Sequence, residues 1–296
     1  RCFGSMGTGT TGANVMLLDL DQGRLWVFLG GLLVFGVLET LWPAGRRRGP
    51  RATRWVRHGL LAAVNTVLVR TLVFVPLLLW MVWLEEQGWG LVRLVGLVGI
   101  PELIFSVLLL DAFDYFWHRA NHRIPFLWRF HKVHHSDNAL DVTTALRFHP
   151  GELLLSGLAK AGWLAVLGPT PVAWFLFEAL VSASAQFHHA DLRLAPRLER
   201  ALRWLWVTPA FHGAHHLVDR RWGDRNFSTL VPWWDRLFGS FEAPPAPAYY
   251  AEVPEPLGLP EGRAQADHLD ALLLGPFRGL NQQGMRHLRP QLRSEQ

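Results

Sequence analysis

The sequence predicts an all-α protein: a polytopic membrane helical bundle with a cytoplasmic, histidine-rich helical cap that holds a di-metal site. Three observations support this prediction. Hydrophobic residues make up 50% of the chain and gather in apolar runs, some as long as a bilayer core requires. Arginines gather between the first two runs, as in a cytoplasmic loop. Histidines recur three and four residues apart beside the runs, a spacing that places them on shared helix faces.

The apolar runs define the predicted membrane part. The first run ends at Pro43, and the next segment holds six arginines within residues 46–57. The positive-inside rule assigns that segment to the cytoplasm. The remaining runs are expected to form two hairpins, each of which returns the chain to the same side. The predicted runs are 25–42, 60–84, 91–110 with a break at Pro101, 150–167 and 171–187.

The chain is expected to divide into a flexible N-terminal extension over 1–24, a membrane-embedded domain over 25–243 and a C-terminal tail over 244–296. Residues 191–230 are polar and arginine-rich with interspersed tryptophans, so they are expected to cap the site at the membrane interface. The single cysteine, Cys2, excludes an internal disulfide. The formal charge is +5, but the basic residues lie between apolar runs, so no nucleic-acid partner is expected.

The histidines predict a metal site. Eleven of the 14 histidines lie between His118 and His216. Neutral imidazole is the commonest protein ligand of zinc, copper, iron and nickel, and eight or more convergent imidazoles exceed the needs of one ion, which indicates two. They form HxxxH at His118 and His122, HxxHH at His131, His134 and His135, a pair at His188 and His189, and HxxHH at His212, His215 and His216. Each of these helical motifs is expected to present one imidazole-bearing face.

Two carboxylates are candidates to orient these imidazoles. Asp111, Asp114, His118 and His122 lie three, four and four residues apart, on one stripe of a helix. A carboxylate beside a ligating histidine accepts its second N–H and fixes the tautomer, so Asp111 or Asp114 is expected in this role. The alternative is an interfacial carboxylate paired with Arg119.

The chain resembles the fatty acid hydroxylase/sterol desaturase superfamily of integral-membrane di-metal oxygenases, over roughly residues 25–241. The motifs that carry the resemblance, in order, are DAFDYFWHRANH, WRFHKVHHSD, RFHPGE, FHHAD, TPAFHGAHH and DRNFSTLVPWWDRLFGSF. The resemblance implies two iron ions that activate O₂ to hydroxylate or desaturate a C–H bond of a lipid. The lipid tail would lie among the membrane helices and its target carbon near the metals, at the cytoplasmic face.

The resemblance also implies a ligand set. Its members are His118, His122, His131, His134, His135, His189, His212, His215 and His216, with His188 as the alternative register for His189. His149 matches a His-Pro pair of the family and is a possible additional site residue. Some relatives have one more histidine, where this chain has Ser184 and Ala185. Haem and flavin signatures are not visible, so an electron-transfer partner of the reductase, ferredoxin or cytochrome type is implied.

Histidine ligands do not by themselves select iron over zinc, which leaves two alternatives. One is a zinc-dependent membrane hydrolase; against it, Arg119, Ala120 and Asn121 separate the first two histidines, without the glutamate of HExxH. The other is a histidine-rich metal transporter, which would need ligands at the bilayer midplane and not in the polar flanks of the runs.

Overall fold

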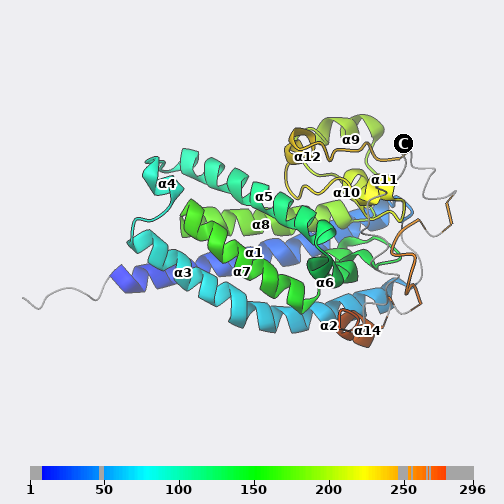
Figure 1. Ribbon diagram of the computed structural model, residues 1–296, viewed down its shortest axis with the longest axis horizontal. Coiled ribbons are helices and arrows are strands. Elements are labelled where there is room, and N and C mark those ends of the chain that lie inside the picture. The colour runs from blue at the N-terminus through cyan, green and yellow to red at the C-terminus, as the bar shows by residue number, and fades with distance from the viewer. Residues whose placement is uncertain are drawn as a thin grey trace, which may run out of the picture.

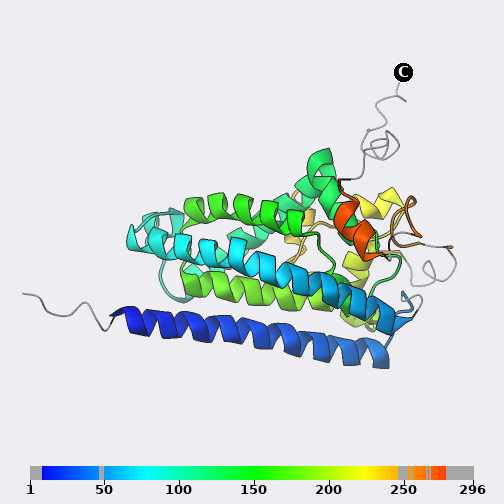
Figure 2. The same cartoon turned by 90° about the horizontal axis from the view of Figure 1, so that it is seen from below.

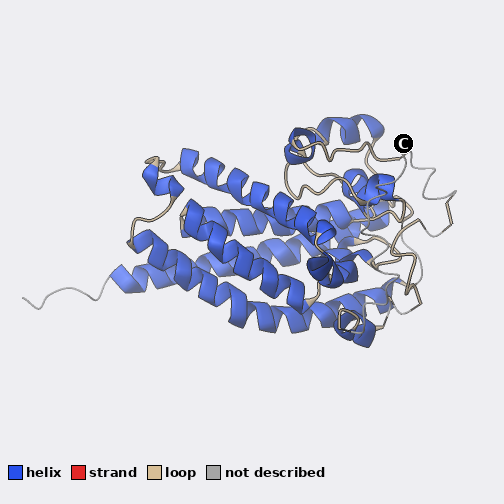
Figure 3. Cartoon of the chain, viewed as in Figure 1, coloured by secondary structure: helices blue, strands red, loops and turns tan. Residues whose placement is uncertain are grey.

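A computed structural model describes residues 9–46, 50–245, 253–254, 256–264, 266 and 268–277 (Figure 1). The described part is mostly helical and contains no strand, only two isolated bridges (Figure 3). Its helices are α1 Gly9–Leu41, α2 Arg51–Val69, η1 Arg70–Phe74, α3 Val75–Glu86, α4 Leu91–Leu94, α5 Ile100–Arg123, α6 Pro125–His135, η2 Val142–Leu146, α7 Pro150–Leu167, α8 Pro171–His189, α9 Pro196–Leu202, α10 Pro209–His215, α11 Arg220–Gly223, α12 Trp233–Leu237 and α14 Leu269–Leu274.

The long helices α1, α2–α3, α5, α7 and α8 run side by side, and the short helices α6, α9, α10, α11, α12 and α14 gather at one end of this bundle (Figures 1 and 2). Large buried side chains from α3, α5, α7 and α8 fill the centre of the bundle, among them Met81, Leu110, Leu164 and Trp174. The all-helical class, with a helical cap that carries the histidines, agrees with the sequence prediction.

Two helical stretches, Gln22–Leu41 and Arg51–Leu94, are long and apolar enough to cross a membrane by length and composition, and few of their residues are buried inside the protein. The predicted run 91–110 is broken, as expected, but just before Pro101: α4 ends at Leu94 and α5 begins at Ile100, with Gly96 and Gly99 at positive φ between them. Within the predicted extension, residues 1–8 lie outside the described part, and α1 begins at Gly9, before Leu25.

The second run bends through a π-helix. α2, η1 and α3 are continuous, and Pro76 lies just after η1. Proline cannot donate to the carbonyl four residues before it, and its ring clashes with that carbonyl. The wider π turn at Arg70–Phe74 provides the local change of winding that a proline in a long helix needs.

The far end of the bundle is fixed by a close approach of two turns. Gly168 ends α7 in the left-handed conformation, at φ 61°, and a Cβ there would lie 2.1 Å from the carbonyl oxygen of Trp89. Buried Glu102 of α5 accepts hydrogen bonds from the backbone N–H and the hydroxyl of Thr170, which caps α8. These contacts anchor α7 and α8 at this end, so that their opposite ends meet the short helices.

Candidate metal centre

Prolines set the corners that bring the histidine-bearing helices together. Ile124 is extended, as the residue before a proline tends to be, so α5 ends at Arg123 and α6 begins at Pro125. α6 then packs directly against α5. α10 begins in the same way at Pro209, with the Thr208 hydroxyl accepting the N–H of Phe211 as its cap.

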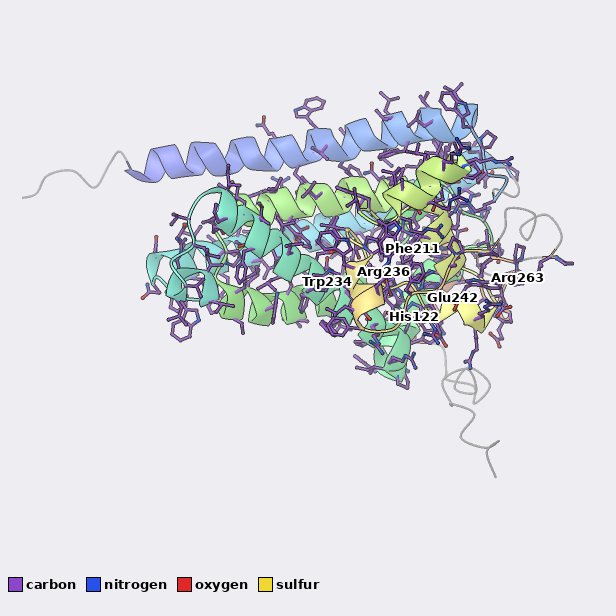
Figure 4. All side chains as sticks on the ribbon, turned by 90° about the horizontal axis from the view of Figure 1, so that it is seen from above. His122, Phe211, Trp234, Arg236, Glu242 and Arg263 are labelled. Carbon is purple, nitrogen blue, oxygen red and sulfur yellow. The ribbon has the colours of Figure 1, made fainter. Side chains whose placement is uncertain are left out.

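Nine histidines converge in two groups at this end of the bundle, where Figure 4 labels His122 and Phe211. Each offers one imidazole nitrogen, and within a group these nitrogens all lie within 4.8 Å of one another. Group one is His118, His122, His131, His135 and His215, and group two is His134, His189, His212 and His216. α6 and α10 contribute to both groups.

Each HxxHH motif divides its histidines between the two groups. On α6, His131 and His135 belong to group one, while His134 belongs to group two. In each motif, the two histidines that are four residues apart belong to one group. The middle histidine, His134 or His215, belongs to the other group. One helix face of three imidazoles is wide enough to serve two adjacent centres.

The inner nitrogens are spaced as ligands of a common ion. In group one, the Nε2 atoms of His122 and His135 lie 3.1 Å apart, and those of His118 and His215 lie 3.0 Å apart. In group two, the Nε2 of His189 lies 3.1 Å from that of His134 and 3.0 Å from that of His212. Two nitrogens that bind one metal at about 2.1 Å and at roughly a right angle lie about 3 Å apart, so both groups fit a metal ion.

Outer hydrogen bonds fix the tautomers. The Nδ1 of His118 donates to the Phe227 carbonyl at 2.8 Å, and the Nδ1 of His215 donates to the Arg225 carbonyl at 2.6 Å. A carbonyl only accepts, so each Nδ1 carries the proton and each neutral imidazole has a bare Nε2. Burial lowers the pKa of His215 to about 3, which keeps that ring neutral at pH 7. Two bare nitrogens 3.0 Å apart repel each other unless a cation lies between them.

The same neutral state holds elsewhere in the two groups. Burial is the largest cause that lowers the pKa of His134, His135, His212 and His216 well below the ordinary value, and the neighbouring imidazoles lower it further. Neutral imidazole is the form that ligates metals.

Glu152 is a candidate site residue that the sequence analysis did not identify. It lies in the first turn of α7, it is 6% exposed, and its Oε1 accepts from the Nδ1 of His131 at 2.7 Å. The Nε2 of His131 has no hydrogen-bond partner among the described residues, so it is available to a metal. The signal was present in the RFHPGE motif, because a carboxylate follows a helix-starting proline there.

A short loop supplies the two carbonyls that orient group one. Asn226, between Arg225 and Phe227, adopts a left-handed conformation at φ 61°, which asparagine tolerates better than most residues. Its side-chain N–H₂ donates to the Glu242 carbonyl at 2.9 Å. Buried Asp235 accepts the backbone N–H of Phe227 at 2.8 Å. The late motif DRNFS…WDRLFG therefore positions the loop that orients His118 and His215.

The predicted role of the two aspartates is wrong for both. Asp111 is fully buried and accepts hydrogen bonds from the backbone N–H groups of Leu230 and Val231 and from the indole of Trp234, and so fastens the loop before α12. Asp114 pairs with Lys160 at 3.3 Å, not with Arg119. In the described part of the chain, Glu152 is the carboxylate at hydrogen-bond distance from a grouped imidazole.

The two additional candidates lie outside both groups. The Nδ1 of His149 accepts the N–H of Gly151 at 2.9 Å as the cap of α7, and its Nε2 donates to the Leu273 carbonyl at 3.0 Å. Both nitrogens are thus used, which makes His149 a helix cap. His188 is buried with its ring 4.0 Å from that of His212, and the backbone of Thr229 hydrogen-bonds to it. The geometry brings His189, and not His188, into group two.

Two buried arginines form hydrogen bonds and ion pairs with the segments next to the histidine groups. Arg46 donates to the carbonyls of Pro209 and Ala190, at the start of α10 and the end of α8. Arg54 pairs with the buried carboxylates of Asp137 and Asp141, just after α6. These two members of the arginine-rich segment therefore also hold the helices that carry the histidines.

Comparison with known proteins agrees with this geometry. Residues 103–240 match the family described as fatty acid hydroxylase. The match covers just under half of the chain, and it agrees with the resemblance to the fatty acid hydroxylase/sterol desaturase superfamily. The match contains both groups of histidines, and the recognition made from the histidine motifs is confirmed.

Three relatives illustrate the range of the family. The chain is 30% identical to human (Homo sapiens) alkylglycerol monooxygenase over 153 residues, which are 48% of this chain and 31% of the relative. It is 30% identical to an ornithine lipid hydroxylase of Rhizobium tropici over 149 residues, 50% of this chain and 44% of the relative. It is 26% identical to cholesterol 25-hydroxylase of Mus musculus over 235 residues, 74% and 75% of the two chains. The chain thus spans less than half of the first two relatives, and no solved structure matches it significantly.

Proposed function

We propose that the protein is a membrane-bound di-iron oxidoreductase that uses O₂ and external electrons to hydroxylate or desaturate a C–H bond of a lipid. The observation that carries the proposal is the pair of adjacent, buried, all-imidazole groups, whose inner nitrogens are spaced as ligands of two ions. When bound, iron would supply the redox chemistry of O₂. The relatives are named as hydroxylases and monooxygenases of three lipid classes, which supports a lipid substrate.

The nine grouped histidines are the proposed ligands. Glu152 and the carbonyls of Phe227 and Arg225 would hold their rings in orientation by accepting Nδ1–H. Aromatic rings exclude water from the site: Phe148 stacks on His134 at 4.6 Å, and Trp128 lies 5.1 Å from His122. A dry, pre-oriented site strengthens electrostatic interactions and protects reactive states from water.

The hydrolase alternative receives less support. A hydrolase would need a general base facing the metal-bound water. Among the described residues, the carboxylate nearest a grouped imidazole is that of Glu152, and it lies on the outer nitrogen of His131. We therefore favour the oxygenase, with an electron-transfer partner of the reductase, ferredoxin or cytochrome type.

The proposed placement is a multi-pass membrane protein with the histidine end in the cytoplasm. Two apolar helices and the arginine-rich segment at the histidine end support this orientation. Thr53 is exposed beside that segment and is a suitable labelling site, whereas Ser294 lies outside the described residues. With Thr53→Cys in a chain that also carries Cys2→Ser, a membrane-impermeant thiol reagent should label intact cells only after the membrane is opened. Labelling from outside would reverse the orientation.

Metal content tests the centre itself. Protein purified in detergent should hold close to two metal ions per chain, and lipids of expressing cells should contain a product that is absent when the cells grow without oxygen. One ion per chain, or a product that forms equally without oxygen, would contradict the proposal.

A further inference from the structure

Three charged side chains meet inside the bundle where α5, α7 and α8 adjoin. The Nζ of Lys160 lies 3.3 Å from Oδ1 of Asp114 and 3.2 Å from Oε1 of Glu178. The same ammonium group lies over the buried ring of Phe177, 5.2 Å from the centre of the ring. We call Asp114, Lys160 and Glu178 the charged triad.

The triad differs from three other buried carboxylates, those of Glu102, Asp111 and Asp235. Glu102 accepts hydrogen bonds from a serine hydroxyl, a threonine hydroxyl and a backbone N–H. Asp111 accepts two backbone N–H groups and an indole N–H, and Asp235 accepts two backbone N–H groups and a hydroxyl. These three are saturated by donors that hold the fold together. Asp114 and Glu178 instead share one ammonium group, with no other donor in the described residues.

The triad therefore lacks one positive charge. Two carboxylates and one ammonium sum to one net negative charge, which is unfavourable between apolar helices unless a cation or a proton balances it. The side chains remain reachable, at 12% exposure for Lys160, 16% for Asp114 and 23% for Glu178. A cationic group brought to the triad would complete its charge and its hydrogen bonding.

The triad is also close to the histidines. Asp114 lies four residues before His118 on α5, so the two share a helix face about one turn, or about 6 Å, apart along the axis. A lipid head group held at the triad would leave the neighbouring carbons of its chain within reach of group one.

We infer that Asp114, Lys160 and Glu178 form a recognition site for a protonated amino group of a lipid, and that this site sets which carbon faces the histidines. The binding part of the inference stands on the triad alone, and the part about the oxidised carbon rests on the proposed function.

Binding of three probes with one chain and different head groups tests the inference. Hexadecylamine, hexadecanol and palmitate are titrated into the full-length protein in lipid nanodiscs, with intrinsic tryptophan fluorescence as the readout. We expect the amine to bind about tenfold or more tightly than the alcohol, as a charge-assisted hydrogen bond would give, and palmitate to bind least. Equal binding of the three probes by the wild-type protein would overturn the inference.

Substitutions separate recognition from a structural role of the triad. Glu178→Gln and Asp114→Asn should each bring amine and alcohol close to parity, whereas Lys160→Met should increase the preference for the amine, because it leaves two carboxylates unpaired. Glu86 is exposed at the C-terminal end of α3, outside the triad, so Glu86→Gln is the control that should leave all three affinities unchanged. An amine preference that persists in Glu178→Gln and Asp114→Asn would refute the site even where Lys160→Met fails to fold. The titration needs no oxygen, so a protein that prefers the amine but oxidises no lipid would keep the site and refute only the proposed function.

Discussion

Removal of the Glu152 carboxylate should weaken metal binding in group one. Glu152 accepts Nδ1–H of His131 at 2.7 Å, and both side chains are buried, with exposed fractions of 6% and 2%. The second oxygen of Glu152 has no hydrogen-bond partner among the described residues. The bond from His131 is therefore the main interaction that offsets the burial of this carboxylate. The carboxylate thereby orients the ring and makes the inner nitrogen a stronger donor.

The expected magnitude follows from this contact. Loss of a partner that orients a ligating histidine costs about 10–100-fold in metal affinity, which is about 1.4–2.8 kcal/mol. Glu152→Ala removes the acceptor and should fall at the upper end. Glu152→Gln keeps a carbonyl acceptor without the charge and should fall near tenfold.

Competition with a chelator measures the effect. Purified protein is titrated with a chelator of known affinity while bound metal is counted per chain, and Glu86→Gln serves as the control. Glu152 also lies in the first turn of α7, where a negative charge stabilises the helix by about 0.3–1 kcal/mol, so melting of the metal-free proteins must be compared as well. Unchanged metal affinity in Glu152→Ala, with normal folding, would refute the role that we assign to this carboxylate.

Three further predictions follow from the two groups. His134→Ala removes one of the four imidazoles of group two and should lower the metal content from close to two ions per chain towards one, by elemental analysis; wild-type content would remove His134 from the ligand set. Asn226→Ala places an ordinary residue at φ 61° and loses the bond to Glu242, so it should lower stability by about 1–3 kcal/mol and loosen metal binding, while Asn226→Gly keeps the conformation and should cost less; equal losses would contradict the conformational argument. Metal-free protein should lose stability as the pH falls from about 6.5 towards 3. Burial lowers the pKa of His215 to about 3, so in this window His215 binds a proton in the unfolded chain but not in the folded protein. For His215 alone the free energy of unfolding should fall by about 1.4 kcal/mol per pH unit, and a denaturant midpoint that stays flat across this window would contradict the prediction.

The sequence predicts the parts of the site that depend on local geometry. The histidines, their helices and their end of the bundle follow from spacings of three and four residues and from helix-starting prolines such as Pro125. The division of each HxxHH motif between two groups does not follow, because it depends on which helices lie on either side of α6. Lys160 is distant from Asp114 in the chain, and only the packing of α7 on α5 shows that these two residues pair. The sequence also does not show the role of Asn226. Its left-handed backbone lies between the carbonyls of Arg225 and Phe227, and only the fold brings the Nδ1 atoms of His215 and His118 to these carbonyls.

The source of the inserted oxygen tests the central claim most directly. Membranes that contain the protein, supplied with a reductase system and a lipid extract, are incubated under ¹⁸O₂, and the lipid products are analysed by mass spectrometry together with the oxygen consumed. The account predicts that lipid oxidation consumes O₂ and requires reductant, and that any new hydroxyl carries label from ¹⁸O₂; a desaturated product would consume O₂ without gaining label. A product that forms without O₂, or a hydroxyl labelled from water, would contradict the account.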